Sequence, residues 1–153
     1  MKRLLPFVFA GIFAAAAAAQ SNEPEVGMPL FAPADMADLN EYRWKKRPVL
    51  VFADSEYDPA FIEQMELLHA RPDELAERDV IVLTDTDPAA RSAMRLKMRP
   101  RGFMLVLVGK DGEIELRKPF PWDVREITRS IDKMPMRQRE IREEKDATGE
   151  ILD

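Results

Sequence analysis

The chain has 153 residues, with 23 Lys plus Arg against 28 Asp plus Glu, one His and no Cys. Without cysteine it can hold no disulfide framework, no thiolate nucleophile, no iron–sulfur cluster and no dithiol redox couple. A single histidine also excludes histidine-rich metal sites, and the length fits one domain with a core of ordinary size.

The N-terminal segment has the pattern of a secretory signal peptide. The basic pair Lys2-Arg3 precedes an apolar run over residues 4–19, and polar residues follow. The small residues Ala17 and Ala19 predict cleavage after Ala19. A membrane anchor is the competing interpretation, but a helix of this run spans only about 24 Å, less than the roughly 30 Å of a hydrocarbon core. We therefore expect a periplasmic or secreted protein without a stable membrane anchor after cleavage.

Charge argues against a nucleic-acid partner. Removal of residues 1–19 leaves 21 basic and 28 acidic residues, a net charge of −7. Nucleic-acid binding needs a basic stripe, whereas the positive residues here are interleaved with acidic ones.

The first half of the remaining chain predicts a leader followed by a strand, a helix and a second strand. Prolines in residues 20–37 indicate an extended leader, although residues 34–42 can form a short helix, and we place the domain at 38–135. The apolar run 48–53 predicts a strand buried on both faces. Asp58-Pro59 then supplies a helix N-cap and first helical residue, and residues 79–84 predict a second buried strand.

The second half predicts a helix, a hairpin and another helix. Asp87-Pro88 repeats the helix start and predicts one helix that runs up to Pro100. Two apolar segments flank a Gly-Lys-Asp-Gly turn at 109–112, which indicates a β-hairpin. Asp123 predicts a helix cap, and Pro135 should stop that helix. The charged C-terminal tail, 136–153, is expected to be either a solvated helix or frayed.

This order of elements predicts an α/β fold. Two buried strands joined by a helix should be parallel, through a right-handed crossover. With the hairpin and closing helix added, we expect a thioredoxin-like central mixed sheet of about four strands, in the order β-α-β-α-β-β-α, flanked by helices.

Several segments carry a closer family resemblance, which spans about residues 38 to 142. They are Tyr42-Arg43-Trp44, the run 47–53, Glu77-Arg78-Asp79-Val80, Gly102-Phe103, the turn 109–112 and the run 134–140. Together and in this order they resemble the bacterial domain of unknown function 4174, the prokaryotic branch of the DUDES group. The resemblance implies a thioredoxin-like fold and an extracytoplasmic setting, and it supplies no catalytic residues.

The chain departs from thioredoxins at the redox positions. The segment 51–56 resembles the thioredoxin strand that runs into the redox loop, but the two cysteine positions hold Glu56 and Pro59. The position of the family's cis-proline holds Met104. Thiol chemistry is therefore absent.

Polar residues follow both predicted parallel strands, at the ends where ligands gather in open α/β sheets. The strand that begins near Gly102 should run antiparallel to the second strand and bring two arginines to the same place. The candidate binding residues are Asp54, Ser55, Glu56, Asp58, Asp85, Asp87, Arg99 and Arg101.

These residues allow simpler interpretations. Asp58 and Asp87 are explained as helix N-caps, and the other carboxylates as solvated groups paired with Arg99 or Arg101. Catalysis by paired carboxylates would need one acid with a raised pKa. The alternating acids 54–58 suggest a calcium loop, but the required glycine is Pro59 and the required glutamate is Met65. We predict no metal site and no cofactor.

The sequence is most consistent with a secreted or periplasmic binding or adaptor module. Its partner would be a protein or a small polar ligand. The alternative is a carboxylate-based or cation-dependent enzyme that uses the same acidic residues. A third possibility is that the charged tail after Pro135 docks a partner.

Overall fold

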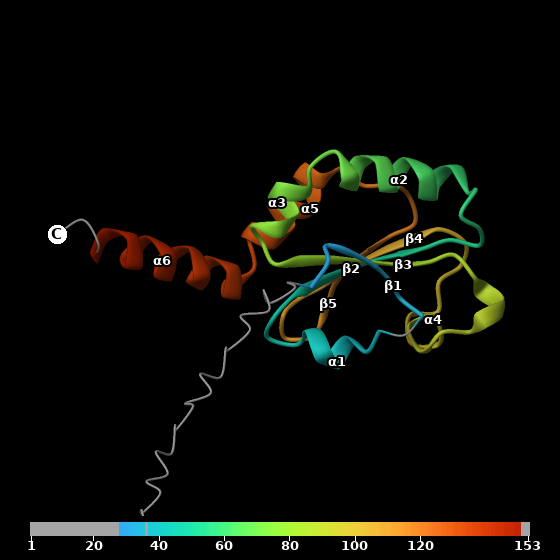
Figure 1. Cartoon of the computed structure of the whole chain (residues 1–153), viewed down its shortest axis with the longest axis horizontal. Helices are drawn as coiled ribbons and strands as arrows, with labels where there is room; N and C mark the ends of the chain where they lie inside the picture. Colours follow the sequence, from blue (N-terminus) through green and yellow to red (C-terminus); the bar gives the residue numbers. More distant parts are fainter. Residues whose placement is uncertain (1–27, 36, 151–153) are drawn as a thin grey trace, which may run out of the picture.

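Five strands form one mixed sheet, and helices cover both of its faces (Figure 1). The computed structural model describes residues 28–35 and 37–150, so the predicted signal peptide lies outside the described residues. The strands are β1 (Phe31–Pro33), β2 (Arg47–Phe52), β3 (Val80–Asp85), β4 (Met104–Val108) and β5 (Ile114–Lys118). The helices are α1 (Leu39–Tyr42), α2 (Pro59–His69), α3 (Pro72–Ala76), the 3-10 helix η1 (Pro88–Ala90), α4 (Ala93–Met98), α5 (Val124–Asp132) and α6 (Pro135–Glu150).

The sheet has the strand order β1-β3-β2-β4-β5. β1 and β2 run parallel to β3, whereas β4 is antiparallel to β2 and β5 is antiparallel to β4. The register places Phe52 opposite both Asp85 and Met104, and Leu105 opposite Lys118. β2, β3 and β5 therefore end where β4 begins, and we call this end of the sheet the rim.

The α/β prediction is confirmed, with one strand more than expected. β1 lies in the segment that we predicted as an extended leader, and it adds to the outer edge of β3. Val82 donates its N–H to the Leu30 carbonyl at 2.7 Å, and Ala34 donates to Thr84 at 2.8 Å. Proline is tolerated in edge strands, and Pro33 is the last residue of this one.

The sheet separates two apolar layers. One face packs against α2, α3 and α5 through residues such as Val49, Leu68 and Ile127, and the other packs against α1 and α4 through Phe52 and Met98. All six residues of β2 are buried. Because both faces are covered, β2 and β3 are continuous apolar runs instead of alternating ones.

The predicted single helix from Asp87 to Pro100 is wrong, because two short helices occupy this segment. η1 ends at Arg91, whose φ of 49° is left-handed, and the chain restarts as α4 with Ser92 as N-cap. The Ser92 side chain accepts the Arg95 N–H at 3.1 Å. The break turns the Ser92 hydroxyl toward the end of β3.

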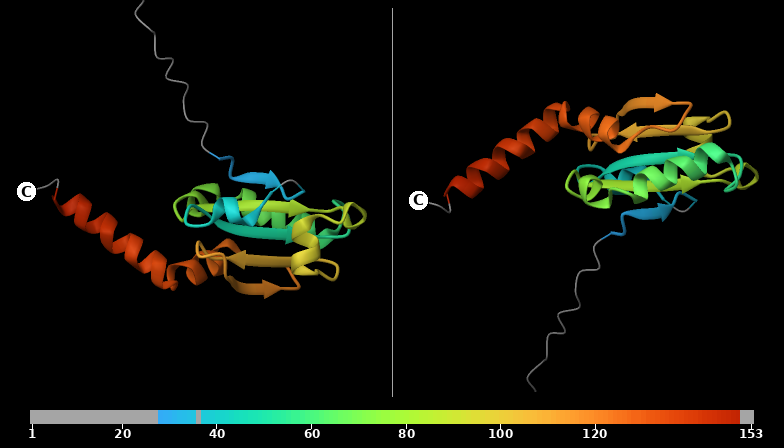
Figure 2. Two further views of the ribbon diagram at one scale, coloured as in Figure 1. Left: turned by 90° about the horizontal axis from the view of Figure 1, so that it is seen from below. Right: turned by 90° about the horizontal axis from the view of Figure 1, so that it is seen from above.

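Pro135 begins a helix as well as following one. It is the first residue of α6, a position where the missing N–H of proline costs no hydrogen bond. The predicted charged tail is therefore helical up to Glu150. In both views of Figure 2, α6 points away from the sheet, and residues 142–149 are exposed.

Candidate functional site

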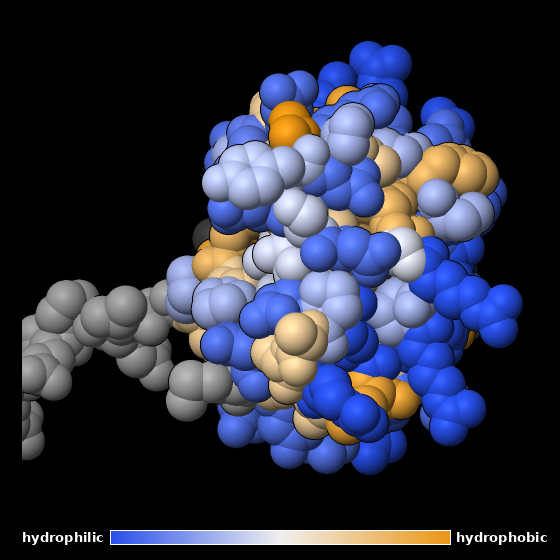
Figure 3. All heavy atoms as spheres, turned by 90° about the vertical axis from the view of Figure 1, so that its right-hand side faces the viewer, coloured by the Kyte–Doolittle hydropathy of each residue, from blue (hydrophilic) through white to orange (hydrophobic). Residues whose placement is uncertain are grey.

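The rim brings together the two loops that the sequence predicted as neighbours. Ala53, which follows β2, donates its N–H to the Asp85 carbonyl at the end of β3, at 3.0 Å. Figure 3 shows this side of the molecule, where hydrophilic residues dominate and apolar ones form separate small patches. The predicted acidic residues do converge here, but they have different roles.

Asp85 is buried in an ion pair with Arg95 of α4. One oxygen of its carboxylate accepts hydrogen bonds from Arg95 Nε at 3.1 Å and from Arg95 Nη2 at 2.8 Å. The other oxygen accepts a hydrogen bond from the Ser92 hydroxyl. Arg95 Nη2 also donates to the Ala53 carbonyl at 2.9 Å, so the guanidinium joins the ends of β2 and β3 to α4.

Electrostatics fix Asp85 in its ionised form. Burial raises the pKa of Asp85, but the hydrogen bonds from Arg95 and Ser92 outweigh burial, and the pKa lies below its ordinary value. A general acid would need a raised pKa. Asp85 is the only buried carboxylate among the predicted site residues, and its role is structural.

Three other predicted residues bond to the backbone of their own loops. Asp58 caps α2 by accepting the Ala60 N–H at 2.8 Å, and Asp87 caps η1 by accepting the N–H groups of Ala89 and Ala90. The Ser55 hydroxyl accepts the Tyr57 N–H at 3.1 Å. Asp54 and Glu56 are exposed on the same loop and remain accessible to a partner, and Glu56 also accepts a hydrogen bond from the Tyr57 side chain.

Arg99 and Arg101 pair with none of these carboxylates. They are exposed, and neither side chain makes a hydrogen bond or an ion pair with another described residue. Instead they line a cavity of about 270 Å³ at the β4–β5 side of the rim. The cavity is lined by Arg99, Arg101, Phe103, Met104, Arg117, Lys118 and Pro119.

The lining of this basic cavity has four cations and no acid. Arg117 is held by its hydrogen bond to the Met98 carbonyl, at 2.7 Å, and the Lys118 ammonium lies 4.7 Å from the centre of the Trp122 ring. Phe103 and Met104 supply apolar surface. This arrangement suits an anionic group attached to an apolar one.

Sequence reasoning found two of the four cations. Arg117 and Lys118 end β5, and the hairpin register places Lys118 opposite Leu105, close to Arg101 and Phe103. The Gly-Lys-Asp-Gly turn had predicted this hairpin, so counting outward from the turn could have identified both residues.

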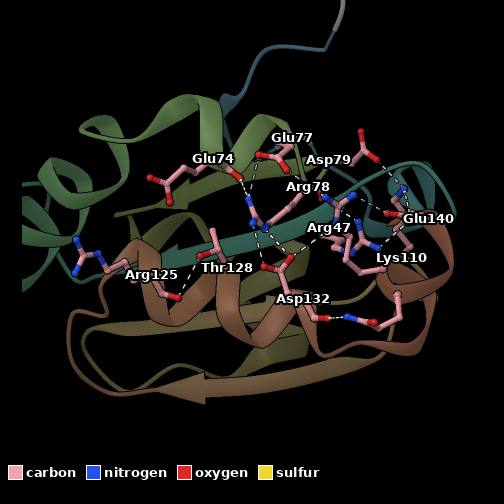
Figure 4. A network of polar contacts seen from close by, with 12 residues as sticks. Arg47, Glu74, Glu77, Arg78, Asp79, Lys110, Arg125, Thr128, Asp132 and Glu140 are labelled. Carbon is pink, nitrogen blue, oxygen red and sulfur yellow. Dashed lines mark hydrogen bonds and ion pairs between the residues drawn. The ribbon is translucent and has the colours of Figure 1, made fainter. Parts of the chain in front are cut away.

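The opposite end of the sheet carries a network of ion pairs (Figure 4). Arg47 is fully buried at the start of β2 and donates to Glu140 of α6 at 2.9 Å. Lys110, in the β4–β5 turn, bonds both Glu140 and Asp79, at 2.7 and 2.8 Å. Arg78 pairs with Asp132 of α5 at 2.8 Å. The two contacts of Glu140 attach the first turns of α6 to the sheet, and the Arg78–Asp132 pair attaches the end of α5.

Two features have no candidate among the described residues. Within residues 28–35 and 37–150, no three or more His, Cys, Asp or Glu side chains group in a way that could hold a metal ion. In the same ranges, no helix is long and apolar enough to cross a membrane.

Solved structures that share this fold include proteins named as thioredoxins and peroxiredoxins. A thioredoxin peroxidase I from Plasmodium yoelii matches with a TM-score of 0.52 and 16% identity, covering 67% of this chain and 80% of that one. The reduced 2-Cys peroxiredoxin of Plasmodium vivax gives 0.54 and 15%, covering 67% and 85%. Desulfothioredoxin from Desulfovibrio vulgaris Hildenborough gives 0.51 and 13%, covering 69% and 97%. The fold is therefore thioredoxin-like, as predicted.

Comparison at the level of sequence gives a family but no activity. The family model described as Domain of unknown function (DUF4174) matches residues 38–140. A comparison with curated proteins finds no match.

Proposed function

The chain belongs to the DUF4174 family and combines a thioredoxin-like fold with a complete absence of cysteine, and from this premise we propose that it is a binding module that acts without catalysis. Its ligand would be a protein segment or small polar molecule that carries carboxylates beside apolar groups.

The basic cavity on the rim is the observation that carries this proposal. Four cations converge around apolar surface, although the chain as a whole has a net charge of −5. Arg99 and Arg101 have no side-chain partner among the described residues, so a ligand carboxylate would gain charge-assisted hydrogen bonds without displacing one of these residues. Phe103 and Met104 would contact the apolar part of the ligand.

An enzyme that uses the acidic residues has less support. Asp85 is ionised and fully bonded, while Asp58 and Asp87 serve as caps. A secreted or periplasmic setting fits a binding role and rests on the signal-peptide pattern of residues 1–19.

A peptide titration tests the proposal. The probe is a synthetic hexapeptide of alternating glutamate and leucine, and a lysine–leucine hexapeptide serves as its counterpart. Trp122 fluorescence reports binding, because Lys118 lies against its ring, and a Trp44→Phe background removes the other tryptophan. We expect saturable binding of the glutamate peptide, weakened at least about tenfold by Arg99→Glu with Arg101→Glu.

The control variant carries the same charge change elsewhere. Arg142→Glu with Lys145→Glu alters exposed residues of α6 and should leave binding unchanged. If both variants weaken peptide binding equally, the effect is one of long-range electrostatics, and the cavity is not the binding site. Binding of the lysine peptide alone would transfer the role to Asp54 and Glu56.

A further inference from the structure

Trp44 has an unusual conformation at the end of the sheet opposite the rim. The residue is 61% exposed and its φ is 65°. A bulky residue is strained in the left-handed region. The contact for the indole that the structure records within its described part is the Arg43 guanidinium, 5.7 Å from the ring centre. Trp is also a residue type in which interface energy concentrates.

The loop that presents Trp44 is tied to the β4–β5 turn. The Trp44 N–H donates to the Lys110 carbonyl at 2.7 Å, and Arg43 Nε donates to the Asp111 carbonyl at 3.0 Å. Gly112 has a φ of 87°, and a Cβ there would lie 3.3 Å from Arg43 Nε. Loop and turn therefore form one unit that fixes the indole in place.

The unit carries charges of both signs, with two lysines following Trp44 in the loop and two glutamates following the turn. Lys45 and Lys46 make no side-chain hydrogen bond or ion pair with other described residues. The side chains of Glu113 and Glu115 likewise have no cationic partner there. Burial, together with the carboxylates of Asp111 and Glu113, raises the pKa of Glu115, so this acidic half would gain from an external cation.

We infer that this surface is an interface between two copies of the chain, with the Lys45–Lys46 half of each copy facing the Glu113–Glu115 half of the other. A two-fold interface is formed by the same patch on both copies, so the patch must be complementary to itself. A surface that carries both unpartnered cations and unpartnered acids meets this requirement, and Trp44 supplies an exposed apolar contact. An anionic membrane or an acidic protein would fit Lys45 and Lys46 but would be repelled by the two glutamates.

Such a dimer makes the molecule bivalent. The interface lies at the end of the sheet opposite the rim, so the two rims face away from each other. Two binding sites on one particle can hold two partners, or bind one repetitive partner with greater avidity. This inference does not depend on what the rim binds.

Sedimentation velocity over a concentration series tests the interface, because charge-reversal variants should change the oligomeric state. We expect the wild-type chain to sediment at twice its monomer mass. Lys45→Glu with Lys46→Glu should give monomers, as should Glu113→Lys with Glu115→Lys. An equimolar mixture of the two variants should form heterodimers, because both halves of the interface are then attractive again.

Trp44→Gly separates association from folding. Glycine adopts a φ of 65° without strain, so this variant should remain folded by circular dichroism and become monomeric. Glu143→Lys with Glu144→Lys, on the exposed part of α6, should remain dimeric. A wild-type monomer, or a mixture that stays monomeric, overturns the inference. Monomers that co-sediment with phosphatidylglycerol vesicles would assign the surface to lipid.

Discussion

The two ends of the sheet satisfy their polar groups over different distances along the chain. At the rim, Asp58 and Asp87 bond to residues two or three positions away, and Asp85 bonds to Arg95 ten positions away. At the opposite end, Arg47 pairs with Glu140 across 93 positions. Local bonds shape individual loops, whereas long-range pairs hold separate elements together. The opposite end therefore has more of the ion pairs between distant elements, and the rim keeps exposed charges available for binding.

Among the changes considered, loss of Arg47 should lower the free energy of unfolding most. Arg47→Met would leave Glu140 with Lys110 as its only strong partner and would remove a donor to the Arg78 carbonyl at 2.9 Å. Breaking a buried pair from one side costs about 3–5 kcal/mol of unfolding free energy. Urea denaturation measures this loss.

A double variant shows whether the pair or the packing matters. Arg47→Met with Glu140→Met removes both charges, so it should cost less than the single change. If Arg47→Met alone lowers the unfolding free energy by less than about 1 kcal/mol, the opposite end does not have the role that we assign to it.

Loss of the buried Asp85 carboxylate at the rim should lower the free energy of unfolding by a smaller amount. Asp85→Asn keeps the shape but leaves the Arg95 guanidinium without its charge partner, at a cost of about 2–3 kcal/mol. Because Arg95 also bonds to backbone carbonyls, the domain should remain folded. A loss as large as that of Arg47→Met would remove the contrast between the two ends.

Acid should weaken the contribution that ionised Asp85 makes to the stability of the fold. The pKa of Asp85 in the folded chain lies below its ordinary value of 3.8, so the unfolded chain binds the proton more tightly. The stabilisation is complete above about pH 5 and fades as the pH falls through the folded pKa. The difference in unfolding free energy between wild type and Asp85→Asn should therefore shrink on acidification. A difference that grows below this pH would contradict the assignment.

The Ser92 hydroxyl should account for the smallest of these effects. Ser92→Ala removes the cap of α4 and one hydrogen bond to Asp85, which costs about 1 kcal/mol in thermal or chemical unfolding. Asp87→Ala, at the exposed cap of η1, is the matched change and should cost less. Equal losses would mean that the bond to Asp85 adds nothing to the cap.

Local signals predicted much of the fold. Asp58-Pro59 and Asp123 do cap helices, and the apolar runs before Asp54 and Asp85 are the central strands. β1 was missed because its pairing with β3 is decided by a neighbour distant in sequence. The helix break at Arg91 was missed because the apolar spacing continues through it.

The buried cations were the main omission at both ends. Arg95 lies in a helix with Lys97 and Arg99 nearby, and nothing local indicates that its carboxylate is Asp85. Arg47 offered a better signal, since it directly precedes an apolar run with both faces buried. A cation there requires an anion from elsewhere in the chain, and sequence alone does not indicate that the anion is Glu140.

The stacking of the only histidine on β1 gives the molecule an internal spectroscopic reporter. The His69 ring lies 4.0 Å from the Phe31 ring at an interplanar angle of 22°, so the phenyl ring current shifts the imidazole proton resonances while β1 is paired. With one histidine in the chain, these resonances need no assignment by mutation. One-dimensional NMR can therefore follow the attachment of the edge strand separately from global unfolding.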